Sequence, residues 1–236
     1  MTNRVIAEVV NVGKQYKTGD TVITALASSS MNLKSGELTL IIGPSGSGKT
    51  TLLSLFGCVI YPSFGDVFVD GVKMNDLSEN ELAAIRLKKI GFVFQQFNLV
   101  APLNSLENVM LPMLLQGISE SEASKRASSV LANVGMSKKL NKLPKTLSGG
   151  EQQRVAIARA LVTDPDMILC DEPTASLDIK SVAVVMEELK QIAAKGKAVA
   201  VVTHDTRLTT FANRIVYVND GMVSDKPFED ENFTKI

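Results

Sequence analysis

The chain has 236 residues, 45% of them hydrophobic, and its 25 Lys and Arg side chains are balanced by 25 Asp and Glu side chains, for a formal net charge of +0. Such a balance argues against a polyanion-binding surface, so we expect no nucleic-acid partner. The sequence contains neither an apolar run long enough to cross a membrane nor a signal-peptide pattern, so we expect the chain by itself to be soluble and cytosolic.

The N-terminal part predicts several strands. Residues 4–10 and 22–33 are rich in β-forming residues, and Tyr16 lies in a polar turn between them. An aromatic side chain in that position either packs locally or stacks on a nucleotide base. Residues 38–42 form a short apolar run typical of a buried strand, and residues 66–72 resemble one arm of a hairpin. The flanking strands predict a small antiparallel sheet beside a main sheet.

The stretch GPSGSGKT, residues 43–50, follows the strand expected at 38–42 and precedes a helix expected from Lys49 to about Val59. Its spacing fits G-x-x-x-x-G-K-[ST], the phosphate-binding P-loop. The glycines let backbone N–H groups approach an anion, and the helix directs its positive end to the same place. Lys49 would reach the β- and γ-phosphates of a nucleotide, and the Thr50 hydroxyl would contact Mg²⁺. The alternative is an ordinary Gly- and Ser-rich loop.

The middle of the chain changes in character. A helix over 79–88 and a strand over 90–94 lead to Gln95, at the strand end where open α/β sheets place ligands. Residues 104–116 and 119–134 have helical spacing, and Ser119 with Glu122 predicts a capping box at the second of these helices.

We therefore expect one α/β domain with a mainly parallel sheet. Residues 1–97 and 148–225 would form the core together with an antiparallel β lobe. Residues 98–147 would form an inserted helical lobe, and residues 226–236 a polar tail.

The stretch LSGGEQQR, residues 147–154, opens an amphipathic helix in which Ser148 and Glu151 predict another capping box. Gly149 and Gly150 at the helix start would leave backbone N–H groups free, which makes a second anion site. Because one nucleotide does not need two phosphate sites in the same chain, this pattern suggests that two chains share each nucleotide.

Acidic residues and the only histidine follow two predicted strands. The apolar run before Asp171 and Glu172 predicts a buried strand that delivers both carboxylates to its end. Asp171 would hold Mg²⁺ through water, and Glu172 would orient and polarise an attacking water. His204 follows the strand at 199–203 and would lie at the same edge. The alternatives are an acidic turn and a structural histidine. Asp178 lies in the loop before a helix over 180–195.

Together these motifs resemble the nucleotide-binding subunit of ATP-binding-cassette (ABC) transporters over nearly the whole chain. GPSGSGKT resembles the Walker A motif, LSGGEQQR the signature motif and MILCDEP (167–173) the Walker B motif. Gln95 corresponds to the Q-loop, Asp178 to the D-loop, His204 to the switch histidine and Tyr16 to the adenine-stacking aromatic. Glu151 is a departure, because many members carry Gln there.

The resemblance implies an ATPase that uses ATP and Mg²⁺. The catalytic residues would be Glu172, His204, Lys49 and Gln95, and the metal residues Thr50, Gln95 and Asp171. The implied nucleotide-binding set is Tyr16, Gly43, Pro44, Ser45, Gly46, Ser47, Gly48, Lys49, Thr50, Thr51, Gln95, Ser148, Gly149, Gly150, Glu151 and Asp178.

The resemblance also implies partners. Two copies of the chain would pair head to tail around two ATP molecules, and a membrane permease on a separate chain would hold them at the cytoplasmic face of the cell membrane. The sequence is similar to the short cassettes of macrolide-export, lipoprotein-release, haem-export and glycolipid-export systems. The main alternative is a non-transport ABC ATPase that acts on nucleic acid or the ribosome.

Overall fold

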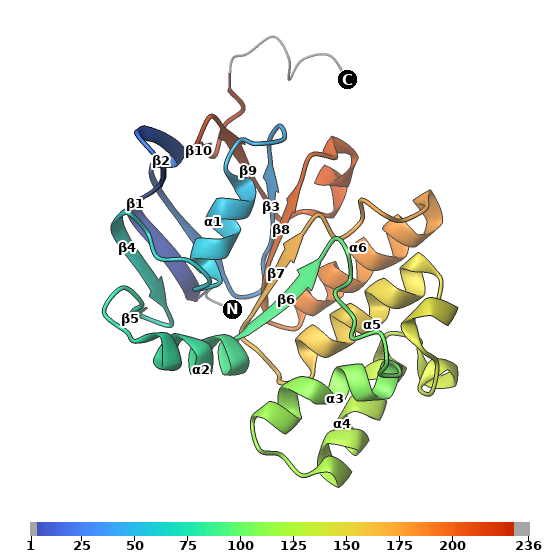
Figure 1. Ribbon diagram of the computed structural model, residues 1–236. Coiled ribbons are helices and arrows are strands. Elements are labelled where there is room, and N and C mark those ends of the chain that lie inside the picture. The colour runs from blue at the N-terminus through green and yellow to red at the C-terminus, as the bar shows by residue number, and fades with distance from the viewer. Residues whose placement is uncertain (1–3, 229–236) are drawn as a thin grey trace.

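The computed structural model describes residues 4–228 and contains two sheets (Figure 1). An antiparallel sheet has the order β2-β1-β4-β5. A second, six-stranded sheet has the order β10-β9-β3-β8-β7-β6, and it is parallel except for the β9–β10 hairpin. The strands are β1 (Val5–Thr18), β2 (Thr21–Lys34), β3 (Leu38–Ile42), β4 (Phe64–Val69), β5 (Val72–Lys73), β6 (Ile90–Phe94), β7 (Met167–Asp171), β8 (Ala198–Thr203), β9 (Arg214–Asn219) and β10 (Met222–Ser224).

Helices cover both faces of the main sheet (Figure 1). The α-helices are α1 (Lys49–Phe56), α2 (Glu79–Lys89), α3 (Ser105–Leu115), α4 (Glu120–Asn133), α5 (Gly149–Leu161) and α6 (Ile179–Ala194). Three 3₁₀ helices are η1 (Ser137–Lys139), η2 (Pro144–Thr146) and η3 (Thr206–Phe211). Helix α1 lies between the two sheets, and α5 and α6 lie on the opposite face of the main sheet.

Strand β3 explains how the sheet is buried on both faces. All its residues are buried, with Leu40 and Ile42 in the cluster beneath α5 and α6 and Ile41 in the cluster beneath α1. Successive side chains of a strand point to opposite faces, so an unbroken apolar run suits a strand covered on both sides. The α/β fold expected from the sequence, with its antiparallel sheet and parallel main sheet, is confirmed.

Local details differ from the sequence expectations at three places. Tyr16 lies in β1 and not in a turn, because the strand continues past register shifts and pairs Tyr16 with Ile23. Helix α1 ends at Phe56, and Cys58 just beyond it has a φ of 54°, which is incompatible with a continuing helix. Ser119 caps α4, but Glu122 bonds Arg126 at 2.6 Å instead of completing the capping box.

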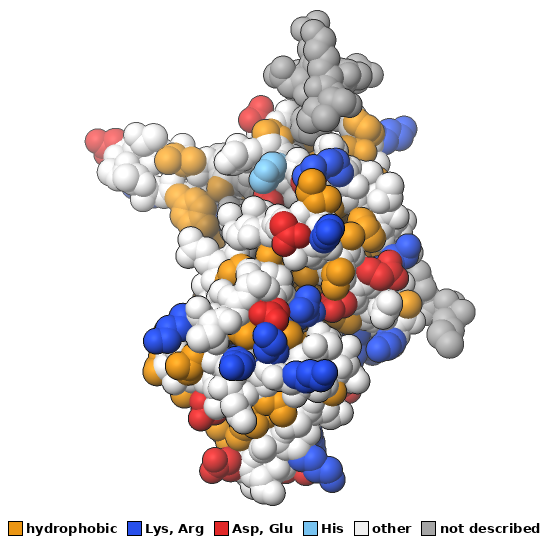
Figure 2. Space-filling view, turned by 90° about the vertical axis from the view of Figure 1, so that its right-hand side faces the viewer, with side chains coloured by type: hydrophobic (Ala, Val, Ile, Leu, Met, Phe, Trp, Pro, Cys, Tyr) orange, Lys and Arg blue, Asp and Glu red, His pale blue; other side chains and the backbone are white. Residues whose placement is uncertain are grey.

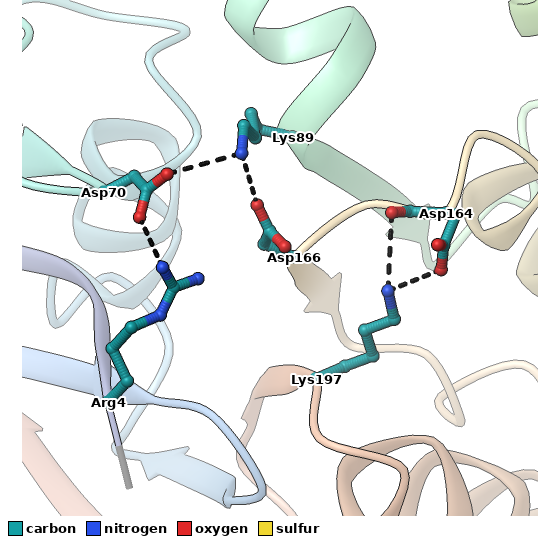
Figure 3. Close-up of polar contacts among 6 residues, drawn as sticks. All are labelled: Arg4, Asp70, Lys89, Asp164, Asp166 and Lys197. Atoms are coloured by element: carbon teal, nitrogen blue, oxygen red, sulfur yellow. Dashed lines mark hydrogen bonds and ion pairs between the residues drawn. The ribbon is translucent and has the colours of Figure 1, made fainter.

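An ion-pair chain joins the two sheets at the edge where β6 and β7 begin (Figure 3). Asp70, in the turn after β4, contacts Arg4 at 2.9 Å and Lys89 at 3.3 Å. Lys89 also contacts Asp166 at 2.7 Å, directly before β7. Because these side chains are partly exposed, the pairs contribute little energy individually. Together they connect the β4–β5 turn to the beginning of β6 and β7. The C-terminal ends of β6, β7 and β8 lie at the opposite end of the sheet and take no part in this ion-pair chain.

Candidate active site

The P-loop connects β3 to α1 in the strand–turn–helix order expected from the sequence. A Cβ at Gly43 would lie 2.0 Å from the Val218 carbonyl oxygen, so the loop passes too close to β9 for any other residue. Gly48 caps α1 with a φ of 105°, which side chains rarely tolerate, and a Cβ there would lie 2.3 Å from the Ala25 carbonyl oxygen. These two glycines therefore hold the loop in the form that a phosphate site needs.

Lys49 is the buried cation of this loop. Its side chain donates hydrogen bonds to the carbonyl oxygens of Gly43, at 2.9 Å, and Pro44, at 2.7 Å. Burial lowers the pKa of Lys49, while the carboxylates of Glu172 and Asp171 act in the opposite direction. A hollow lined by Ala25 and residues 46–51 opens beside the lysine. An anion entering that hollow would meet a partly desolvated positive charge at a helix N-terminus.

Thr50 and Asp171 are brought together by the order of the strands. The Thr50 hydroxyl donates to Asp171 Oδ1 at 3.2 Å, although the two residues are 121 positions apart. Burial is the main cause of the raised pKa of Asp171. Within residues 4–228 there is no group of three His, Cys, Asp or Glu side chains that could hold a metal by itself. A hard cation such as Mg²⁺ could still bind Thr50 and Asp171 if phosphate oxygens supplied further ligands.

Glu172 and His204 form a second pair at the same edge. The Nδ1 atom of His204 lies 2.9 Å from Glu172 Oε1. Glu172 has a φ of 48°, which is uncommon for a residue other than glycine, and its N–H donates to the Val202 carbonyl oxygen at 3.0 Å. The unusual backbone aims a mostly buried carboxylate at a histidine whose side chain is 66% exposed. Such a pair can bind, orient and polarise a water molecule.

Gln95 and Tyr16 lie at the borders of this region. Gln95 is exposed directly after β6, whose last residue, Phe94, is in register with Asp171. Tyr16 is 41% exposed, and the Lys14 ammonium lies 5.2 Å from the centroid of its ring. An exposed ring face with a neighbouring cation suits a stacking platform.

The signature segment is not part of the P-loop hollow. Among the residues that the structure describes, no residue from Ser148 to Glu151 lines that hollow. Ser148 and Glu151 instead form the predicted capping box of α5: Ser148 N–H donates to Glu151 Oε2 at 2.9 Å, and Glu151 N–H donates to Ser148 Oγ at 3.3 Å. The P-loop hollow and the start of α5 are therefore separate places on the described chain.

Asp178 has a structural role within the chain. It caps α6, and its carboxylate accepts bonds from the N–H groups of Lys180 and Ser181 and from the Ser181 hydroxyl at 2.7 Å. Ser181 in turn packs beside the signature, since a Cβ at Gly150 would lie 2.7 Å from Ser181 Oγ. The loop that carries Asp178 is thus held against the start of α5.

One residue near the site was missed by sequence reasoning. Lys139, at the end of η1, lies with its Nζ atom 3.1 Å from Glu151 Oε1. The lysine is 12 positions before its partner, in a segment without regular periodicity, so no spacing rule links the two. Only the run of lysines just before the signature, at positions 138, 139, 142 and 145, marks the segment as unusual.

Comparison with known proteins identifies the class. The sequence profile of the ABC transporter family matches residues 26–175, and the chain therefore belongs to the ABC transporter family. It is an ATP-binding and ATP-hydrolysing cassette of that family, as its motifs predicted.

The particular relatives include MJ0796 of Methanocaldococcus jannaschii, an ABC transporter ATP-binding protein. It is 48% identical over 218 residues, which cover 90% of this chain and 93% of MJ0796. The macrolide export ATP-binding/permease protein MacB of Agrobacterium fabrum is 39% identical over 92% of this chain, which corresponds to 34% of MacB.

Solved structures agree with the fold. The dimeric structure of MJ0796 superposes with a TM-score of 0.86 at 45% identity, covering 94% of this chain and 100% of that one. A second dimeric structure of MJ0796 represents a post-hydrolysis state with bound ADP and Pi. CbiO1 of Clostridium perfringens, part of the cbiONQ transporter complex, superposes with a TM-score of 0.83 at 30% identity.

Proposed function

We propose that the chain powers a membrane exporter through ATP-driven pairing of two copies. The observation that carries the proposal is the division of the machinery. Lys49, Thr50, Asp171, Glu172 and His204 gather around the P-loop, whereas the signature helix start lies outside the P-loop hollow. A head-to-tail dimer would bring the signature of one copy to the nucleotide on the other and complete both sites at once.

The residue roles follow from this geometry. The γ-phosphate would take over hydrogen bonds that Lys49 now makes with carbonyl oxygens. Thr50 and Gln95 would hold Mg²⁺, with Asp171 holding it through water, and the ion would supply positive charge that neutralises the charge developing on the phosphate. Glu172 would polarise the attacking water, and His204 would hold the γ-phosphate and the Glu172 carboxylate in place. Tyr16 would stack on the base.

A second hollow offers a place where a membrane partner would dock. A groove of about 460 Å³ runs between α2, β6, α3 and the end of α5, and Phe94 and Asn98 line it on either side of Gln95. A segment of a permease on a separate chain that docked there would sense the position of Gln95, and therefore the nucleotide state. The chain would then act at the cytoplasmic face of the membrane. MacB is named as a macrolide export ATP-binding/permease protein, and CbiO1 as part of a transporter complex. These names support transport as the function of the cassette.

The test is the substitution Glu172→Gln, which keeps the shape of the side chain but removes its negative charge. We expect ATP binding to persist and turnover to fall by at least about 10²-fold, because a positioned base typically contributes that much. The variant should also accumulate as an ATP-bound dimer, measured by light scattering after gel filtration with ATP. Exposed Glu187 on α6 provides the matched control, Glu187→Gln, which should turn over ATP normally.

Three outcomes would count against the proposal. Wild-type turnover in the Glu172→Gln variant would remove this carboxylate from the mechanism. A variant that binds ATP, fails to hydrolyse it and stays monomeric at every ATP concentration would exclude the shared site. Stable copurification with RNA or DNA would instead favour the non-transport class of ABC ATPase.

A further inference from the structure

The start of α5 has an unusual electrostatic arrangement. The capping box uses the N–H groups of Ser148 and Glu151, and in the described part of the chain no acceptor is recorded for the N–H groups of Gly149 and Gly150 or for the Ser148 hydroxyl. Three donors therefore remain at a helix N-terminus, which favours an incoming anion. In the proposed dimer this anion is the γ-phosphate bound by the other copy.

Glu151 opposes that attraction. Its carboxylate folds back over the first turn of α5, where Oε2 accepts the bond from Ser148 N–H. This hydrogen bond lowers the pKa of Glu151, and Lys139 adds to the effect against the opposing influence of burial. The carboxylate is therefore charged at neutral pH. A negative charge within one helical turn of a phosphate site repels the phosphate and reduces the effect of the helix dipole.

Lys139 compensates this charge. Its ammonium lies 3.1 Å from Glu151 Oε1, on the oxygen that the capping box does not use. The Glu151 side chain is only 20% exposed and that of Lys139 38%, so solvent screens the pair less than a fully exposed one. The same contact connects η1 to α5 and keeps Glu151 in the capping pose. Figure 2 shows the face that carries η3 and the loops before α5, where Lys and Arg side chains gather.

We propose that Lys139 is a positioning residue for the signature, which neutralises and orients Glu151 so that the start of α5 can accept the γ-phosphate of the partner's nucleotide. The proposal rests on the shared site proposed above and adds a residue to it. Lys139 touches no nucleotide itself and acts through Glu151. A cassette with a neutral residue in place of Glu151 would have no such need for a lysine at this place.

The experiment is a double-mutant cycle in the hydrolysis-deficient Glu172→Gln background. The ATP concentration that gives half-maximal dimer is measured by analytical ultracentrifugation for four chains: the background itself and the background with Lys139→Met, with Glu151→Gln, or with both. Lys139→Met alone should raise this concentration about two- to fivefold, the upper part of the range for a partly exposed charge pair. With Glu151→Gln already present, Lys139→Met should change it by less than about twofold, because the charge to be compensated is gone.

Matched controls separate charge compensation from other effects. Lys138→Met removes an identical charge from the neighbouring position of η1, where the lysine has no ion pair recorded in the described residues, and should leave dimerisation within about twofold. Lys139→Arg keeps the positive charge, so this chain should form half-maximal dimer at nearly the same ATP concentration as the background. High salt should shrink the difference between the Lys139→Met chain and its background, which loss of packing would not do. Thermal unfolding without nucleotide verifies that each chain is folded.

Each result decides a separate question. If Lys139→Met weakens dimerisation equally with and without Glu151→Gln, or has no effect on either, the inference about Lys139 is wrong and the shared site stands. If Lys139→Met does not fold, the comparison of Lys139→Arg with Lys139→Gln gives the same charge test. If the background chain forms no dimer with ATP at all, the proposed function itself fails.

Discussion

At the scale of single residues, the site depends on backbone forms that side chains rarely adopt. Glu172 at a φ of 48° and Gly48 at 105° each lie next to a strand or helix end, where neighbouring hydrogen bonds hold the chain in place. Strain of this kind persists when the surrounding structure determines it, and it often marks functional positions. Here it turns the Glu172 carboxylate towards His204 and lets the P-loop pass close to Ala25.

The two cysteines provide a residue-scale prediction. Cys58 is 4% exposed and Cys170 is fully buried. Burial raises the pKa of Cys58 from 9.0 to about 11, and it raises that of Cys170 as well. Since the thiolate is the reactive form, we expect both thiols of the folded protein to resist Ellman's reagent at pH 8 and to react on unfolding.

The raised pKa of Cys58 also makes the stability of the fold depend on pH, and its direction gives the direction of that dependence. The folded state holds the Cys58 proton more tightly than the unfolded state, so stability is retained below pH 9 and falls as the pH rises through about 11. Replacing Cys58 with alanine should flatten this part of the stability curve, although the cavity lowers stability at every pH. Rapid labelling of the native protein at pH 8 would contradict the buried placement.

At the scale of elements, α5 connects the two ends of the proposed mechanism. Its N-terminus carries the signature, and near its C-terminus the backbone of Ala160 packs against β6, the strand that ends just before Gln95. A Cβ at Gly91 would lie 2.4 Å from the Ala160 carbonyl oxygen and 2.7 Å from Ile168 Cδ1. The close contact between this helix and this strand therefore requires glycine.

Gly91→Ala tests this contact. We expect a loss of about 1–3 kcal/mol in the free energy of unfolding, because an added methyl group meets backbone and not a flexible side chain. The measurement is the midpoint of urea unfolding, compared between chains whose unfolding free energy depends on urea concentration with the same slope. Turnover should fall as well if β6 is displaced and Gln95 moves with it. An unchanged midpoint would mean that the helix and strand are less tightly packed than the structure indicates.

At the scale of the whole molecule, a shared site predicts complementation. Lys49→Ala removes the P-loop cation, and Ser148→Arg blocks the signature while sparing ATP binding by the monomer, so each variant alone should be inactive. A head-to-tail dimer of one chain of each kind contains one site with both changes and one intact site. With random pairing in an equal mixture, about a quarter of all sites are intact, and turnover should recover to at most that fraction.

The controls are each variant alone at the same total concentration. Because only mixed dimers have an intact site, activity should peak at equal amounts of the two chains. Turnover by the Ser148→Arg chain alone would show that one copy suffices for hydrolysis. Absence of recovery at every ratio, with mixed dimers present, would show that the two halves do not complement in this way.

The sequence by itself determined which local elements form and which chemical groups they carry. Glycine spacing, capping pairs and apolar runs depend on neighbours within a few residues, so they predicted the P-loop, β6, β7, β8 and the Ser148–Glu151 box. Local rules failed for Tyr16, which pairing with β2 places in a strand. They also failed for Glu122, because two local interactions compete there and the carboxylate pairs with Arg126 one helical turn further on.

The tertiary structure decided which strands are neighbours, and therefore which of these side chains touch. The strand order β3-β8-β7-β6 is not encoded in any local pattern, and it is this order that places Asp171 beside Thr50 and Glu172 beside His204. It also keeps the signature away from the P-loop hollow and brings Lys139 to Glu151. The physical reason is that parallel strands pair through long crossovers, whose packing over the whole core selects the neighbours.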